Sequence, residues 1–272
     1  MKVVPAAAPL REFRKGVWLK ESWLRFSGFT LQTRMTVIQL AQGLLLHSPS
    51  PAQVTAELQR ELAELGTVRY LLAPNEIHNV GLVAFQAAYP NAHTTGCVGH
   101  PRRVKHARFD LLLGTDSTPG EVPWLAGGEL EFHVIRGNRL LHEVALFHRP
   151  SKTLILTDAV EIIDEAAHLA PPLPSAPLRA VLRWAGFQFG APCMSPEHQA
   201  LCRDPEALRA SLSVLEAWDF EALVIAHGRL TQGEAARRAL REAFKHNIDV
   251  DKRRSAPARL LWATLARLEG GD

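Results

Sequence analysis

Cysteine is scarce in this sequence, and the positions of the few cysteines exclude several kinds of protein. Only three occur in 272 residues, at Cys97, Cys193 and Cys202, and no two of them form a C-x-x-C pair. An odd number at this density argues against a scaffold held by disulfides, and the missing pairs argue against a structural zinc site made of four cysteines. We therefore expect a protein of a reducing compartment, the cytoplasm.

Long apolar runs and a strong excess of one charge are also missing. No stretch approaches the roughly 18 apolar residues that span a bilayer, so we expect no membrane association. The formal net charge is only +3, far from the dense basic surface of a dedicated nucleic-acid-binding protein. A short apolar stretch broken by prolines opens the chain, and we interpret residues 1–15 as a flexible leader rather than a signal peptide.

The rest of the composition is that of an ordinary globular protein. Hydrophobic residues make up 47% of the chain and charged residues 22%, enough for one large domain over residues 16–272. In the first part, strands alternate with helices, a pattern typical of parallel strands covered by helices. The predicted strands are 17–24, 28–33, 35–46, 68–72 and 93–98, and the predicted helices run from Ser50-Pro51 to Gly66 and over 80–88.

The second part returns to strands and closes with helices, so the whole order of elements predicts an α/β fold. A tight turn at Ser151-Lys152 joins two of these strands as a hairpin. The predicted elements, in chain order, are strands at 109–113, 130–135, 142–147 and 153–156, a proline-rich loop or crossover at 164–177, helices within 178–217, a strand at 222–226, and helices at about 231–246 and 256–268.

Polar residues of the metal-ligating kind stand where these buried strands begin or end. Ligand pockets in α/β sheets form outside the strand ends, where the loops converge on one edge. Imidazole and carboxylate groups held rigidly at such an edge suit a metal centre with an open coordination position. The residues in question are Asn75, His78, His142, Asp158 and His227.

Three segments carry a resemblance to a known family, namely residues 73–79, the hairpin at 147–158 and residues 225–228. Together they resemble the metallo-β-lactamase superfamily, and more narrowly a branch known only as a domain of unknown function. The resemblance covers roughly residues 17–245. It implies an αββα sandwich, here with a C-terminal helical extension, and hydrolysis of esters, thioesters, lactones, amides or phosphodiesters with one or two metal ions.

The metal-binding motif of that family is only partly present. Its H-x-H-x-D-H pattern maps onto Ala73, Asn75, Ile77 and His78, so only the final histidine is retained. The aspartate that would orient the attacking water is replaced by Ile77. In the two-metal arrangement of the family, the residues that remain belong to the second site, and the first site is nearly empty.

The resemblance therefore implies one divalent metal ion, with zinc favoured and iron or manganese as alternatives. Its ligands would be His78, Asp158 and His227, with His142 as a weaker match. The ion would lower the pKa of a bound water, which attacks the substrate. Catalysis would then involve Asp158, His78 and Asn75, which lines the site. Glu76, Glu143 or Asn75 could position the water.

Each of these residues also has a purely structural interpretation. His78 could cap the helix that follows it, Asp158 could be a helix N-cap or a salt-bridge partner, and His227 could be an ordinary residue at a strand end. Asn75 after Pro74 is a typical turn residue. We expect His148 at the surface of the hairpin.

Two rival functions remain open from the sequence. The fold could persist as a metal-free binding or scaffold protein, since three motif positions have lost their ligands. An RNA-processing nuclease is suggested by the basic run at 101–108, but no aromatic residue interleaves there for base stacking, so a solvated loop is favoured and nucleic acid is not expected as a partner. We expect a small-molecule substrate and consider a homodimer through the C-terminal helices.

Overall fold

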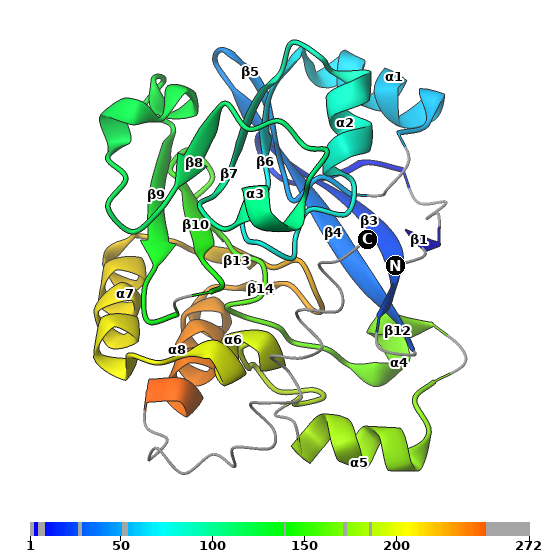
Figure 1. Cartoon of the computed structure of the whole chain (residues 1–272), viewed down its shortest axis with the longest axis vertical. Helices are drawn as coiled ribbons and strands as arrows, with labels where there is room; N and C mark the ends of the chain where they lie inside the picture. The colour runs from blue at the N-terminus through cyan, green and yellow to red at the C-terminus, as the bar shows by residue number, and fades with distance from the viewer. Residues whose placement is uncertain are drawn as a thin grey trace.

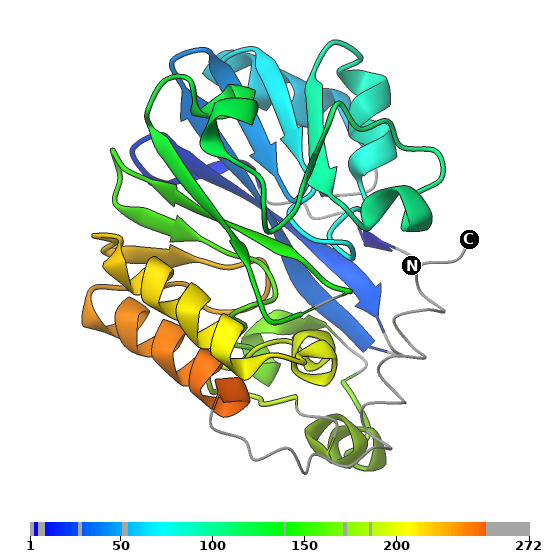
Figure 2. The same ribbon diagram turned by 60° about the vertical axis from the view of Figure 1, so that its left-hand side comes forward.

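The chain folds into two β-sheets packed face to face, with helices on both outer faces (Figures 1 and 2). This αββα sandwich confirms the fold class expected from the sequence. Among the described residues, no helix is both long and apolar enough to cross a membrane. The computed structural model describes residues 3–4, 9–26, 29–50, 54–138, 140–170, 173–184 and 187–248.

The first sheet combines antiparallel strands at one side with parallel strands at the other. Its order is β1-β3-β4-β5-β6-β7-β8, with β2 added beside β3 and β12 beside β4. Pairing is antiparallel from β3 to β5 and parallel from β5 to β8. The strands are β1 (Val3–Val4), β2 (Arg11–Arg14), β3 (Val17–Phe26), β4 (Phe29–Leu40), β5 (Gly43–His47), β6 (Val68–Leu72), β7 (His93–Cys97), β8 (Leu111–Leu113) and β12 (Leu169–Ala170).

The second sheet has the order β14-β13-β11-β10-β9. Strands β10 and β11 pair antiparallel across the turn that contains Ser151-Lys152, which confirms the predicted hairpin. Strand β13 joins β11 in parallel. The strands are β9 (Leu130–Ile135), β10 (Glu143–His148), β11 (Thr153–Ile155), β13 (Ala222–Val224) and β14 (Thr231–Gln232).

The helices connect these strands and cover the sheets. They are α1 (Ala56–Leu65), α2 (Leu82–Ala88), α3 (His100–Arg103), α4 (Glu165–His168), α5 (Ala176–Trp184), α6 (Pro196–Leu201), α7 (Pro205–Ala217) and α8 (Glu234–Ile248), with short 3-10 turns η1 (Pro119–Glu121) and η2 (Pro123–Leu125). Helix α1 begins later than expected, because Thr55 rather than Ser50 is its N-cap and accepts the Leu58 N–H at 3.2 Å.

The structure differs from the sequence predictions at several boundaries. The predicted break between 33 and 35 is absent, because β4 runs unbroken to Leu40 and the chain turns at 41–42 instead. Residues within the expected leader form β1 and β2, which pair with β3. The expected loop at 164–177 contains α4 and β12, and the expected helix at 256–268 lies outside the described residues.

His148 also differs from its expected place at the surface. Its side chain is buried, and its Nδ1 lies 2.7 Å from the Ser151 Oγ within the hairpin. Alternation along a strand places successive side chains on opposite faces, so a histidine at a strand end is drawn inward when its face meets the core.

Among the described residues, three apolar layers cover the faces of the two sheets, and a smaller fourth cluster packs around Leu31 and Phe187. The inner layer lies between the sheets and includes Leu45, Leu146 and Val224. One outer layer packs α7 and α8 against the second sheet around Leu215 and Phe244. The other packs α1 and α2 against the first sheet, with Leu58, Leu62, Leu82 and Phe85 in contact with its strands.

We predict that Leu146→Ala lowers the free energy of unfolding by about 2–5 kcal/mol, because Leu146 is fully buried between the sheets and its removal leaves a cavity. Val83→Ala is the matched control, since Val83 lies on α2 with 43% of its surface exposed. Urea unfolding followed by circular dichroism measures both. Equal loss of stability in the two variants would contradict this account of the core.

Candidate metal centre

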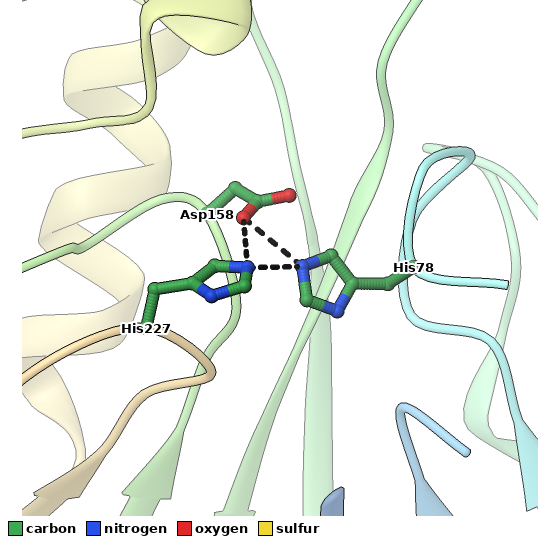
Figure 3. A group of neighbouring side chains, drawn as sticks. All are labelled: His78, Asp158 and His227. Carbon is green, nitrogen blue, oxygen red and sulfur yellow. Dashed lines mark hydrogen bonds and ion pairs between the residues drawn. The ribbon is translucent and has the colours of Figure 1, made fainter. Parts of the chain in front are cut away.

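Three of the predicted ligands meet at one edge of the sandwich. The Nε2 of His78 lies 3.1 Å from Asp158 Oδ1 and 3.2 Å from His227 Nε2, and the His227 Nε2 lies 3.7 Å from the same carboxylate oxygen. The two imidazoles face each other with the carboxylate beside both (Figure 3). All three side chains are at least nine-tenths buried.

The two sheets supply different members of this group. His78 lies after β6 of the first sheet, in the segment that leads to α2. Asp158 and His227 follow β11 and β13 of the second sheet. Strands β11 and β13 are neighbours in parallel, so the residues after them leave the sheet at the same edge. The centre therefore forms only when the two sheets are packed together.

The glycine after His227 allows two loops to approach closely. Gly228 has φ +98°, and a Cβ built on it would lie 2.1 Å from the Ile162 carbonyl oxygen. The neighbouring Arg229 N–H donates to that same oxygen at 2.8 Å. The His-Gly pair therefore has a physical cause, because a larger residue would push the His227 loop away from the loop after Asp158.

Hydrogen bonds at the far nitrogens fix the orientation of both imidazoles. The His227 Nδ1 lies 2.8 Å from the carbonyl oxygen of Gln32, which can only accept, so Nδ1 carries the proton. The His78 Nδ1 lies 2.7 Å from the Ser48 hydroxyl. When both Nδ1 atoms donate, each Nε2 lone pair points into the centre, as it does in metal-ligating histidines.

Asp158 is held from two sides. Its Oδ2 accepts a hydrogen bond from the Asn75 side-chain amide at 2.7 Å, which leaves Oδ1 for the histidines. Its backbone N–H donates to the buried Glu143 carboxylate, which also accepts from the N–H groups of Thr157 and Ala159. The carboxylate that faces the histidines is thus oriented before any ligand arrives.

The charges of the three groups depend strongly on one another. Burial alone would raise the pKa of Asp158, but the charge and hydrogen bond of His78 outweigh it and hold that pKa far below its ordinary value. Burial opposes the charged form of His78, yet Asp158 raises the His78 pKa overall. Burial and the charge of His78 together lower the pKa of His227 to about 4. Without an ion, these shifts favour a proton on His78, which then lies between the charged carboxylate of Asp158 and the neutral ring of His227.

The spacing of the three groups fits a tetrahedral metal ion. Bonds of about 2.0–2.1 Å at tetrahedral angles place neighbouring ligand atoms roughly 3.3 Å apart. The observed separations of 3.1, 3.2 and 3.7 Å bracket that value. Two imidazoles and one carboxylate suit zinc, iron or manganese and leave a fourth position open.

His142, the fourth predicted ligand, does not join this group. Its ring Nδ1 and its backbone N–H both bind the buried carboxylate of Glu76, each at 2.7 Å. Glu143 begins β10 and His142 directly precedes it, so their side chains point to opposite faces, and it is Glu143 that turns towards Asp158.

Two further residues that support the centre could not be recognised from the sequence. Ser48, which holds His78, is buried with φ +56°, a conformation that few residues other than glycine adopt. Arg34 is buried on β4 and donates to the carbonyl oxygens of Ile225 and Gly228, on either side of His227, while pairing with Glu21. Both act from the first sheet, so only the folded structure brings them to the site.

We predict that Ser48→Gly weakens metal binding without disturbing the backbone. Glycine adopts positive φ without strain, so the loss is confined to the hydrogen bond between the hydroxyl and the buried His78 ring, which should lower the free energy of unfolding by about 1–3 kcal/mol and frees the ring. The zinc affinity should fall about 10–100-fold, the range for losing a hydrogen-bonding partner of a ligand.

A chelator-competition titration and the melting temperature of the metal-free protein provide the two readouts. Ser213→Ala, at an exposed hydroxyl on α7, is the control and should change neither. Undiminished zinc affinity in Ser48→Gly would contradict a positioning role for the serine.

A further buried carboxyl group, that of Glu161, lies near the centre. Its Oε2 has no hydrogen-bond partner among the described residues. Burial raises the pKa of Glu161 well above its ordinary value, and the negative charges of Asp158, Glu197 and Glu143 raise it further. The folded state therefore favours the neutral acid, and ionisation at higher pH costs stability.

We predict that Glu161→Gln melts at a higher temperature than wild type at pH 8, and that this difference becomes smaller as the pH is lowered to 5. The folded-state pKa is raised, so wild-type stability falls as the pH rises above the unfolded-state pKa, whereas glutamine does not ionise. Each kcal/mol gained should raise the melting temperature by roughly 2–4 °C. Glu64→Gln, at an exposed position on α1, is the control, and its difference in melting temperature from wild type should be the same at both pH values. A difference that does not change with pH in Glu161→Gln would contradict a raised pKa for Glu161.

Comparison with solved structures shows the fold of the chain. A metallo-β-lactamase from Pontibacter korlensis superposes with a TM-score of 0.57 at 12% identity, over 89% of this chain and 99% of that one. A metallo-β-lactamase from Hirschia baltica superposes with a TM-score of 0.58 at 11% identity, over 88% of this chain and 97% of that one. The DIM-1 metallo-β-lactamase superposes with a TM-score of 0.58 at 13% identity, over 90% of this chain and 99% of that one.

The family of the chain follows from its sequence. No curated protein matches it. The model of the family described as "Domain of unknown function (DUF4336)" matches residues 14–183, a range that contains His78 and Asp158 but ends before His227. The chain therefore belongs to the DUF4336 family and has a metallo-β-lactamase fold.

Proposed function

We propose that the protein is a metal-dependent hydrolase with a single divalent ion held by His78, Asp158 and His227. The observation that supports this most directly is the tetrahedral spacing of the three ligand atoms, with both imidazole Nε2 atoms aimed at one point. Zinc is the favoured ion, with iron or manganese as alternatives. Because His142 binds Glu76, it is not included in the proposed ligand set.

A divalent ion here would lower the pKa of a water molecule and polarise a carbonyl or phosphoryl group, which suits ester, lactone or phosphodiester hydrolysis. The chain provides the orientation for this chemistry. Ser48 and the Gln32 carbonyl hold the two rings, and Asn75 holds the carboxylate of Asp158. None of these groups has to move for the ligands to converge, so their arrangement is preorganised.

A small cavity beside His78 could hold the water that hydrolysis consumes. Its volume is about 30 Å³, and its lining includes Ser48, Ser50 and Ile77. That is room for about one water molecule. The buried Ser50 hydroxyl has no hydrogen-bond partner among the described residues, so it is available to bind such a water. The cavity thus combines a polar wall with a metal-ligand residue.

One structural observation also supports the alternative of a metal-free binding or scaffold protein. Asp158, His78 and His227 also satisfy one another through direct hydrogen bonds. A proton shared in this way can stabilise the fold without an ion. Metal content decides between these two functions.

We also propose that the substrate is a small molecule and that the protein is located in the cytoplasm. The basic run begins on the short helix α3, where His100 is buried and Arg102 is exposed, and nothing in its arrangement favours a nuclease. A homodimer through the C-terminal helices would involve residues 256–268, which lie outside the described residues.

We predict that untagged wild-type protein carries about one divalent ion per chain by elemental mass spectrometry. His78→Ala, Asp158→Ala and His227→Ala should each lose most of it, because two remaining ligands bind an ion weakly. His142→Ala is the matched control and should keep the ion. Wild-type protein that stays metal-free after incubation with zinc, iron or manganese would refute the hydrolase and favour the scaffold function.

A further inference from the structure

The side-chain nitrogen of Asn75 lies among three oxygen atoms next to the proposed metal centre. It is 2.7 Å from Asp158 Oδ2, 2.9 Å from Thr157 Oγ1 and 3.4 Å from Glu143 Oε2. Two of these oxygens belong to carboxylates and one to a hydroxyl. An amide nitrogen has two hydrogens, so it cannot satisfy all three acceptors well. A set of oxygens of this kind is what hard divalent cations bind.

The orientation of the amide is fixed by its other end. Asn75 Oδ1 accepts the N–H groups of Ile77 at 3.0 Å and His78 at 2.9 Å. A flipped amide would place its oxygen against the carboxylates and its NH₂ against two N–H donors, which is unfavourable on both sides. The side chain is fully buried, so water does not relieve either clash. The nitrogen therefore faces the three oxygens.

The negative charge around this nitrogen is already compensated. The Glu143 carboxylate accepts three backbone N–H groups and lies 3.0 Å from the His198 Nε2. The Asp158 carboxylate faces His78 on its other side. Two buried carboxylates can thus share the space around one neutral amide without a second cation.

We propose that the NH₂ hydrogens of Asn75 occupy the position of a second cation, between the nitrogen and these oxygens, and that they limit the centre to one ion. The proposal builds on the proposed function for the first ion. It follows that replacing the NH₂ group by an oxygen creates a site for an additional divalent ion between residue 75, Asp158 and Glu143.

Asn75→Asp tests this with the smallest change in shape. It keeps an oxygen for the Ile77 and His78 N–H groups and replaces the amide nitrogen with a fourth oxygen. Asn79→Asp is the matched control, because the Asn79 amide donates to the Glu76 carbonyl and the variant adds the same charge outside the centre. Manganese stoichiometry is measured by equilibrium dialysis with elemental mass spectrometry, and by the melting temperature with and without manganese.

The expected result is one manganese per chain for wild type and Asn79→Asp, and two for Asn75→Asp with a larger rise in melting temperature. The same stoichiometry in Asn75→Asp and Asn79→Asp would overturn the proposal. If Asn75→Asp does not fold, Asn75→Ala vacates the position without adding charge. It should then take up the extra ion, and a stoichiometry equal to wild type would overturn the proposal.

Failure of the proposed function gives a different result. Wild-type protein without any ion would refute the single-metal hydrolase. An ion gained by Asn75→Ala, which adds no ligand, and not by Asn79→Asp would still show that the amide occupies a cation position.

Discussion

The buried carboxylate of Glu143 is the constraint on which the centre depends. It accepts hydrogen bonds from three consecutive backbone N–H groups, those of Thr157, Asp158 and Ala159, and from the ring of His198. Burying a carboxylate without hydrogen-bond partners would cost a large amount of folding free energy, so these hydrogen bonds are strongly favoured. They fix the bend of the chain after β11, and this bend turns the Asp158 side chain towards the two histidines.

The centre also joins the two sheets of the sandwich. His78 comes from the first sheet, and its partners Asp158 and His227 come from the second. Strand β4 of the first sheet reaches across as well, because the Gln32 carbonyl binds the His227 ring and Arg34 binds the backbone on both sides of that residue. The polar centre therefore depends on the packing of the apolar inner layer that holds the two sheets together.

Ala73, Asn75 and Ile77 stand at motif positions where a metal ligand was expected, and each has a structural role. Ala73 is fully buried in the layer beneath α1 and α2. Asn75 orients Asp158, and Ile77 lines the small cavity beside His78. Histidine at position 73 would disturb this packing, and histidine or aspartate at position 75 would remove the hydrogen bond to Asp158. The contacts of these three residues therefore match the absence of ligands at their positions, and leave His78, Asp158 and His227 as the ligand-type residues of the centre.

The sequence by itself determined the α/β class, the hairpin before Asp158 and three residues that meet at the centre, because apolar periodicity and polar strand ends are local signals. It did not separate His142 from Glu143, since one residue of register decides which of them faces Asp158. It also could not find Ser48 or Arg34. Each acts on a residue far away in the chain, His78 or the His227 loop, and only the packing of the two sheets brings those partners within hydrogen-bonding distance.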